Sequence, residues 1–148
     1  MAPNQVQIRS HVLSTPPAPP QMAADHFARR LELETDAWDL HEDLTNKVNG
    51  IVVLDARQSD SFAAEHIPGA INLHHAKITA DTTATWSKTA TYVVYCAGVN
   101  CNASTKGCAK LADLGFNVKE LLDGLEGWKK EGYPVETGTS PIPVKRRA

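Results

Sequence analysis

Two short apolar runs constrain the fold of this chain more than any other feature. Ile51–Leu54 and Thr91–Tyr95 are continuous and rich in β-branched and aromatic residues, which is typical of strands buried on both faces of a sheet. Turn signals and helical patterns separate the strand-like runs from one another. The pattern therefore predicts an α/β fold, in which right-handed crossovers build a mostly parallel sheet with helices on both faces.

The remaining segments complete this pattern. Further strands are expected at 31–34, 70–73 and 117–122, and helices at 36–47, 59–65 and 102–114, with a short last helix that holds Trp128. Pro68-Gly69 fits a type II turn, because proline presets φ and glycine takes positive φ at no steric cost. Gly115 stands where the helix that ends at 114 needs its stop.

Length and composition indicate one globular domain. The 148 residues are 42% hydrophobic and 22% charged, which is ordinary for a chain with a packed core. We expect a Pro-rich N-terminal arm over residues 1–24, a domain over 25–137 and a short tail over 138–148. Within the arm, Thr15–Pro20 favours extended polyproline II, and a flexible or semi-rigid arm is favoured over a partner-docking motif.

Charge and hydropathy exclude several partner classes. The net charge is −2, so we expect no nucleic acid or membrane partner, and the basic Lys145–Arg147 is interpreted as a solvated terminus. No apolar run approaches the roughly 20 residues of a membrane span, and the N-terminus lacks the features of a secretory signal. A cytoplasmic location is expected, where cysteines stay reduced. Three thiols cannot all pair within the chain, so cysteine is where reactivity should be sought.

Cys96 directly follows the second apolar run, and ligands of such sheets bind beyond the carboxyl ends of the strands. It opens a loop that leads into the predicted helix and consists of Ala97, Gly98, Val99, Asn100, Cys101 and Asn102. Backbone amides and the positive end of the helix dipole should point into this loop, favouring a thiolate on Cys96 and a bound anion. The alternative is a structural cysteine that happens to end a strand, and position alone does not decide between the two.

Four segments around the site resemble the rhodanese family in order and spacing. They are Asp55-Ala56-Arg57, the block Glu65–Leu73, Tyr95-Cys96 and Leu122–Trp128. The resemblance covers about residues 30–136, and its most specific part is His-Ile-Pro-Gly-Ala-Ile-Asn at 66–72. It implies an α/β fold around a five-stranded, mostly parallel sheet. It also implies that Cys96 is the nucleophile of a sulfurtransferase, which accepts a sulfane sulfur as a persulfide and passes it on.

The partners implied by the resemblance are a small sulfur donor and a thiol or cyanide acceptor, or a protein sulfur acceptor. Two departures from the family pattern bear on the donor. The family pattern has a serine directly after the loop and a leucine seven residues later. Ser104 and Leu111 take these positions here, so the loop from Cys96 is two residues longer than usual. In addition, no Arg or Lys lies between Cys96 and Lys106. Each missing hydrogen bond from a cation weakens anion binding by about 1.5–3 kcal/mol, so we expect the loop to bind thiosulfate weakly.

Two other functions remain as alternatives. Long-looped relatives of this fold include phosphatases with a Cys-x5-Arg pattern, but the position of that arginine is Asn102 here, which cannot grip a phosphoryl group as a bidentate cation. The second alternative is a non-catalytic rhodanese-like module that binds a partner protein or senses oxidants. The missing cations and the longer loop favour this module, whereas a cysteine retained in an amide-rich loop favours the enzyme.

The other candidate residues each have two interpretations. Cys101 could resolve a persulfide or sulfenic acid on Cys96 as an intraloop disulfide, or simply tighten the helix entry. Cys108 is expected in the core, on one helix face with Leu111 and Ala112. We expect no cofactor and no metal, because the loop thiols would need further ligands that the spacing does not supply.

Asp55 and Arg57 end a buried strand at the same sheet edge as Cys96. The resemblance implies an electrostatic support for the site, but a structural pair that closes a turn is favoured. His66 is expected to fix its loop through its ring nitrogens, and Trp128 to pack in the core. His74 and His75 follow a strand end, and only one of them could face the pocket, since neighbours on an extended chain point apart.

Overall fold

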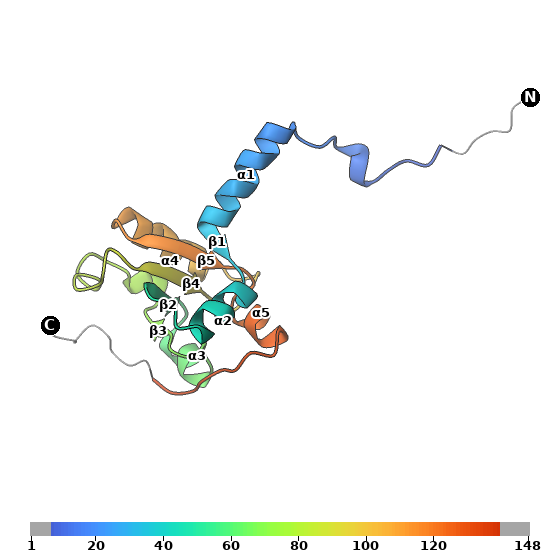
Figure 1. The fold of residues 1–148 in the computed structure, drawn as a ribbon. Helices are drawn as coiled ribbons and strands as arrows, with labels where there is room; N and C mark the ends of the chain where they lie inside the picture. The colour runs from blue at the N-terminus through green and yellow to red at the C-terminus, as the bar shows by residue number, and fades with distance from the viewer. Residues whose placement is uncertain (1–6, 140–148) are drawn as a thin grey trace, which may run out of the picture. The chain divides into compact units, whose positions relative to one another are not determined.

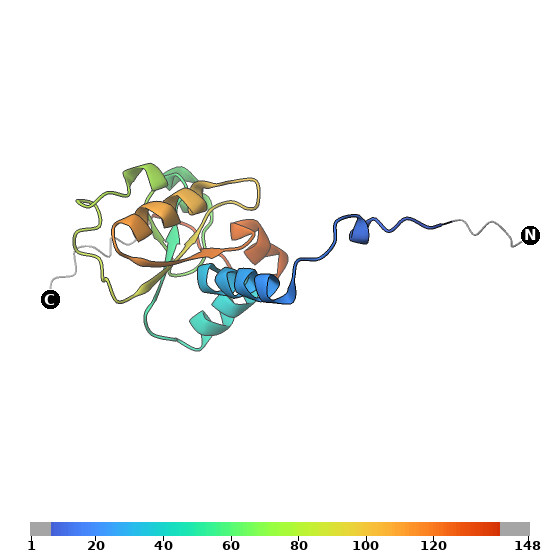
Figure 2. The ribbon, with the colours of Figure 1, turned by 90° about the horizontal axis from the view of Figure 1, so that it is seen from above.

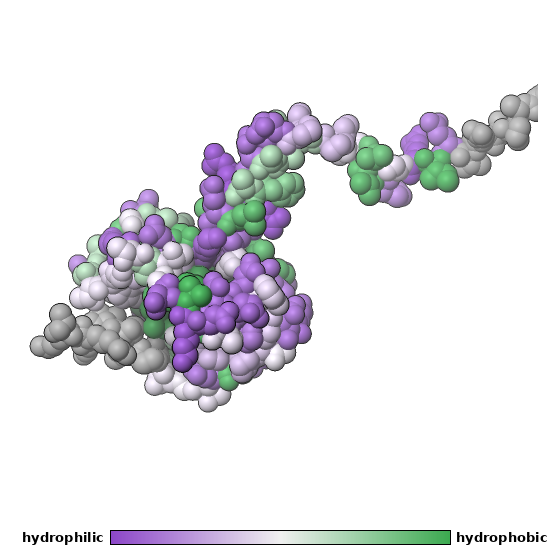
Figure 3. Space-filling view, viewed as in Figure 1, coloured by the Kyte–Doolittle hydropathy of each residue, from purple (hydrophilic) through white to green (hydrophobic). Residues whose placement is uncertain are grey.

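The computed structural model describes residues 7–139 and divides the chain into two compact units, one up to Leu31 and one from Glu32 onward. The first unit contains the 3-10 helix η1 (Val12–Ser14) and most of α1 (Pro20–Leu33). Met22 and Phe27 on α1 are exposed, and apolar side chains lie along this helix in Figure 3. Among the described residues, no helix has both the length and the apolar character needed to cross a membrane.

Helix α1 corrects the sequence prediction for its segment. Residues 31–33 form its last turn, and only Glu34–Thr35 is a strand, β1. Pro20 is the first residue of the helix, a position that tolerates proline because its amide would have no partner there. The Leu-Glu alternation that suggested a strand consists of good helix formers. The boundary expected at residue 24 falls inside this helix.

The second unit is built on a five-stranded sheet in which every strand pair is parallel (Figure 1). The strands after β1 are β2 (Ile51–Asp55), β3 (Ile71–Asn72), β4 (Thr91–Tyr95) and β5 (Asn117–Leu121), in the order β1-β5-β4-β2-β3. This confirms the predicted α/β fold and parallel sheet. Asp55 pairs with Tyr95 at the ends of β2 and β4, so the residues that follow these two strands emerge side by side.

Helices cover both faces of the sheet (Figure 2). On one face lie α2 (Ala37–Thr45), α3 (Ser59–Ala64) and α5 (Gly124–Lys130), and on the other lie α4 (Ala103–Asp113) and the 3-10 helix η2 (His75–Lys77). Strand β4 supplies both hydrophobic clusters by alternation: Val93 and Tyr95 point to the first face, and Tyr92 and Val94 to the second. The surface seen in Figure 3 is accordingly mainly hydrophilic over this unit.

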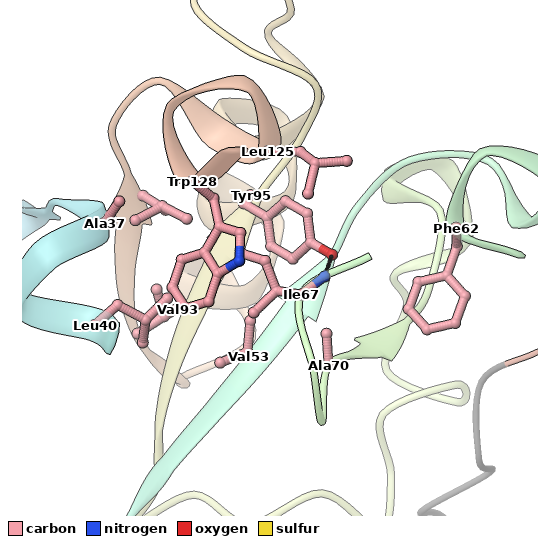
Figure 4. Packing of buried hydrophobic residues seen from close by; sticks show 11 residues of the cluster. Ala37, Leu40, Val53, Phe62, Ile67, Ala70, Val93, Tyr95, Leu125 and Trp128 are labelled. Atoms are coloured by element: carbon pink, nitrogen blue, oxygen red, sulfur yellow. Dashed lines mark hydrogen bonds between the residues drawn. The ribbon is translucent and has the colours of Figure 1, made fainter. Parts of the chain in front are cut away.

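The first cluster packs around Trp128 and Tyr95, both fully buried (Figure 4). The Trp128 indole N–H donates to the Pro134 carbonyl at 2.8 Å, and the Tyr95 hydroxyl accepts from the Ile67 amide at 3.0 Å. The predicted core role of Trp128 is confirmed. The tyrosine bond ties the segment before β3 to the end of β4, next to Cys96.

The His66 side chain fixes the conformation of its loop, as predicted. The ring of His66 stacks on Phe62 with 3.7 Å between centroids, and its Nδ1 lies 2.8 Å from the Phe62 carbonyl oxygen. Its backbone pairs with Glu136 through two hydrogen bonds. The type II turn also forms, with Gly69 at φ 79° and an amide-to-carbonyl bond from Ala70 to Ile67.

Candidate active site

Cys96 lies directly after β4 with its thiol turned into the loop that follows. The residue is 2% exposed. Its Sγ lies 3.2 Å from Ser104 Oγ and 3.1 Å from the Cys101 carbonyl oxygen, with the Gly98 carbonyl oxygen at 4.0 Å. The position at the carboxyl edge of the sheet, in front of α4, is the one that the sequence predicts.

Helix α5 holds the first two residues of the loop by their carbonyl groups. Leu125 donates its amide to the Cys96 carbonyl and Glu126 donates to that of Ala97, both at 2.9 Å. Gly124 has φ 51°, and a Cβ there would overlap the Cys96 carbonyl oxygen. Only glycine therefore fits, which explains the segment Leu122–Trp128 that the resemblance singles out: its turn packs directly against the backbone of Cys96.

The rest of the loop is uncharged and partly open. Val99, Asn100 and Asn102 are exposed, Ala97 and Cys101 are half-buried, and Gly98 is buried. A Cβ at Gly98 would meet Glu126 Oε2 at 2.5 Å, so the Glu126 carboxylate lies directly over the loop. The predicted lack of cations within residues 97–102 is thus accompanied by a negative charge that sequence reasoning missed.

Ser104 connects the Cys96 thiol to a carboxylate on β5. Its hydroxyl donates to Glu120 Oε2 at 2.7 Å, and Thr105 Oγ1 donates to the same oxygen at 2.6 Å. A hydroxyl has one hydrogen to donate, and Glu120 receives it, so toward Cys96 the Ser104 oxygen can act only as an acceptor in this arrangement. The single thiol hydrogen of Cys96 also has the Cys101 carbonyl oxygen as an acceptor, at 3.1 Å. Sequence reasoning missed Glu120. The available signal was a charged residue on the strand next to Thr91–Tyr95, at a position that faces the helix after Cys96.

The two loop cysteines differ in acidity. Burial raises the pKa of Cys96, and the neighbouring Cys101 side chain adds to this, although the Ser104 hydroxyl and backbone amide act against it. Burial also acts to raise the pKa of Cys101, but the Ala103 amide, the Cys96 thiol, the Ala97 amide and the charge of Arg57 outweigh it, so this pKa is lowered. Each of the two side chains also acts on the pKa of the other.

The expectation that the loop favours a thiolate on Cys96 is therefore wrong for this conformation. The predicted donors are present, but the amides of Ala97 and Ala103 act on Cys101, whereas that of Ser104 acts on Cys96 and does not outweigh its burial. Cys96 faces carbonyl oxygens and is almost fully buried. Such an environment favours the neutral thiol.

Asp55 and Arg57 close the turn after β2. Asp55 is fully buried and accepts from the Arg57 amide at 2.9 Å and from its guanidinium in a bidentate contact at 2.7–3.1 Å. Arg57 also donates to the Glu65 carbonyl, and the Asn72 amide group donates to the carbonyls of Asp55 and Arg57. These bonds agree with the favoured interpretation of Asp55 and Arg57 as a structural pair that closes a turn. The charge of Arg57 also helps to lower the pKa of Cys101.

The remaining candidates lie elsewhere. Cys108 is half-buried against the second cluster, and burial together with Glu120 and Cys96 raises its pKa to about 12. Its expected neighbour Leu111 is buried, but Ala112 is exposed. His74 and His75 stand at η2, which packs on α4. Within residues 7–139, His, Cys, Asp and Glu do not gather in groups of three or more that could hold a metal ion.

Comparison with known proteins identifies the family to which this fold and this cysteine loop correspond. The sequence model of the rhodanese-like domain family matches residues 36–131 of this chain. The chain belongs to the rhodanese-like domain family. The structure of BH2092 from Bacillus halodurans is 43% identical, covers 80% of this chain and 87% of its own, and superposes with a TM-score of 0.78.

Two further relatives carry functional names. Thiosulfate sulfurtransferase from Pseudomonas aeruginosa is 27% identical with a TM-score of 0.65, over 76% of this chain and 22% of that protein. The HTH-type transcriptional regulator Rv0324 of Mycobacterium tuberculosis is 35% identical over 88 residues. That match spans 60% of this chain but only 38% of the regulator, so most of the regulator has no counterpart in the matched region.

Proposed function

We propose that this chain is a sulfurtransferase that carries a sulfane sulfur on Cys96. The observation that carries the proposal is the thiol at the end of β4, which is enclosed by its loop between Ser104 and Cys101. The amides of α5 donate to the carbonyl groups of Cys96 and Ala97 and so hold the backbone that carries this thiol. A cytoplasmic location would keep the thiol reduced between cycles.

Transfer takes two displacements. In the first, the Cys96 thiolate attacks the sulfane sulfur of the donor, a new S–S bond forms, and the remainder of the donor leaves with the electron pair of the broken bond. In the second, a thiolate or cyanide attacks the outer sulfur of the Cys96 persulfide and restores the Cys96 thiolate. No cofactor is needed, because both steps are exchanges at sulfur.

Ser104 is placed to respond to the charge on Cys96. With the thiol protonated, the Ser104 hydrogen is donated to Glu120. When Cys96 becomes an anion, the hydroxyl can turn toward it, because Thr105 still donates to the Glu120 oxygen that Ser104 leaves. The hydroxyl thus stabilises the thiolate and the persulfide anion while the carboxylate keeps one donor.

Charge around the loop favours donors with little negative charge. Residues 97–102 carry no cation, and the Glu126 carboxylate lies over Gly98. A dianion such as thiosulfate would approach this carboxylate without a compensating partner. Persulfides of small thiols, or of a protein donor, fit the site better.

The test is uptake and release of one sulfur atom. Incubate the reduced full chain with a small-molecule persulfide, measure its intact mass, and map the added sulfur by peptide mass spectrometry. We expect one sulfur on Cys96, its loss on addition of cyanide with formation of thiocyanate, and neither event in Cys96→Ser. Sulfur on Cys108 with Cys96 unmodified would contradict the assignment.

The alternative from another class is a rhodanese-like module that senses oxidants or sulfane sulfur, and the similarity to a transcriptional regulator favours it. The two functions differ in turnover. An enzyme passes many sulfur atoms to a saturating acceptor, whereas a sensing module loads Cys96 once and retains the modification.

A further inference from the structure

The cysteine loop carries a second thiol that the transfer cycle does not use. The Cys96 Sγ lies 3.1 Å from the Cys101 carbonyl oxygen, and each of the two side chains acts on the acidity of the other. Cys101 is half-buried, whereas Cys96 is almost fully enclosed. Any sulfur added to Cys96 is therefore formed beside a free thiol that solvent can reach.

We infer that Cys101 resolves the Cys96 persulfide by forming a Cys96–Cys101 disulfide and releasing hydrosulfide. This inference rests on the proposed function, because it acts on the persulfide that the transfer cycle forms. It adds a second exit for the sulfur: besides passing to an acceptor, the sulfur leaves as sulfide.

The step balances without an external oxidant. The Cys101 thiolate attacks Cys96 Sγ, whose outer sulfur carries a proton. The Sγ–Sγ bond forms, the bond from Cys96 Sγ to the outer sulfur breaks, and this sulfur departs as HS⁻ with the electron pair. The two cysteines are oxidised and the sulfane sulfur is reduced to sulfide. A small thiol such as glutathione then restores both thiols by two exchange reactions.

The surroundings of the two sulfurs assign their roles. The amides of Ala97 and Ala103 and the charge of Arg57 all favour an anion on Cys101, and the thiolate is the attacking species in thiol exchange. Cys96 lies among carbonyl oxygens, which disfavour an anion and leave its sulfur as the electrophile. Cys108 is held protonated by a pKa of about 12 and packs with the second cluster, so it offers no competing nucleophile.

The experiment follows the loaded protein after the donor has been removed. Load the full chain with a small-molecule persulfide, desalt it, and record released sulfide and intact mass over time without any reductant. For the wild type we expect stoichiometric sulfide and a mass lower than that of the reduced chain by two hydrogens, with Cys96 and Cys101 joined in one disulfide-linked peptide. Cys101→Ser should keep its persulfide, with sulfide release slower by roughly tenfold or more, because the intramolecular thiol is absent.

Cys108→Ser is the matched control and should behave as the wild type. Cys101→Ala serves as a second variant, and both Cys101 variants must first be shown to load sulfur on Cys96. Equal sulfide release in Cys101→Ser and the wild type overturns the inference, as does transfer of the persulfide to Cys101 without a disulfide. Absence of sulfur on Cys96 in every chain overturns the proposed function, and this inference with it.

Discussion

Ser104 Oγ lies 3.2 Å from the Cys96 sulfur, and its hydroxyl hydrogen is directed away from that sulfur. The carboxylate of Glu120 accepts this hydrogen, so in this arrangement the hydroxyl does not stabilise an anion on Cys96, whose pKa burial already raises. Besides burial, the acidity of Cys96 therefore depends on whether the Glu120 carboxylate or the Cys96 sulfur accepts the Ser104 hydrogen. The first two predictions test this competition from opposite sides.

Ser104→Ala should make Cys96 less reactive at neutral pH. The Ser104 side chain lowers the pKa of Cys96 against the larger effect of burial, so its removal should raise this pKa further. The alkylation rate at neutral pH should fall roughly tenfold, as expected when a hydrogen bond to an anion worth about 1.5 kcal/mol is removed. Iodoacetamide alkylation against pH, in a background with Cys101 and Cys108 replaced by serine, measures it. The rates should converge at high pH; a constant ratio at every pH would indicate a packing defect instead.

Glu120→Gln should have the opposite effect. Removing the carboxylate frees the Ser104 hydroxyl to donate to the Cys96 anion and removes a nearby negative charge, so the pKa of Cys96 should fall. The same alkylation profile should shift to lower pH. Thr105→Val keeps the carboxylate while deleting its other donor, and this control should not lower the pKa of Cys96. If the pKa of Cys96 in Glu120→Gln is equal to or higher than that of the wild type, the Ser104 hydroxyl does not turn toward the sulfur.

Asn100→Arg should improve thiosulfate as a donor. The loop contains no cation and Glu126 lies over it, so one added guanidinium should lower the KM for thiosulfate about tenfold. The kcat and the kinetics with an uncharged persulfide should change little. Asn100→Gln controls for the altered side-chain length. If the wild type already saturates at low thiosulfate concentration, the electrostatic argument fails.

The chain should have no useful phosphatase activity. Phosphoryl transfer needs the oxygens of the transferred group neutralised, but exposed Asn102 stands where a phosphatase has its arginine, and Lys106 lies one helical turn further on. Hydrolysis of an activated aryl phosphate should be equal in the wild type and Cys96→Ser. Cysteine-dependent turnover at ordinary enzyme rates would assign the protein to the phosphatase branch of this fold.

Gly124→Ala should destabilise the protein more than Gly132→Ala. Both glycines have positive φ, 51° and 79°, but a Cβ at Gly124 overlaps the Cys96 carbonyl whereas one at Gly132 meets open space. Backbone strain alone costs about 1–2 kcal/mol, and Gly124→Ala should lose more than this in the free energy of unfolding, together with Cys96 reactivity. Urea unfolding of both variants gives the comparison. Equal losses would mean that the loop moves aside freely.

The sheet and the position of Cys96 could be predicted from the sequence because their signals are local. Buried parallel strands such as β2 and β4 appear as unbroken apolar runs, and the residue after such a strand must lie at the ligand-binding edge. The Leu-Glu repeat before β1 was misleading, because alternation suits a strand while the same residues are strong helix formers.

The protonation of the loop could not be predicted in this way. A short loop before a helix supplies amide donors, but which sulfur they reach depends on the turn between Gly98 and Cys101. Glu120 contributes through a strand distant in sequence, and no pattern around Cys96 indicates it. Only the folded arrangement shows that the more acidic thiol is Cys101.

The hydrogen bonds from α5 to the carbonyl groups of Cys96 and Ala97 determine which residues of this loop can be substituted freely. In the sulfurtransferase proposed above, recognition and reaction belong to separate stretches of this short loop. Val99 and Asn100 are exposed and can be substituted without moving the backbone of Cys96. For the proposed transfer from Cys96, substitutions at these two positions would then change which donor or partner protein is recognised and leave the transfer chemistry unchanged.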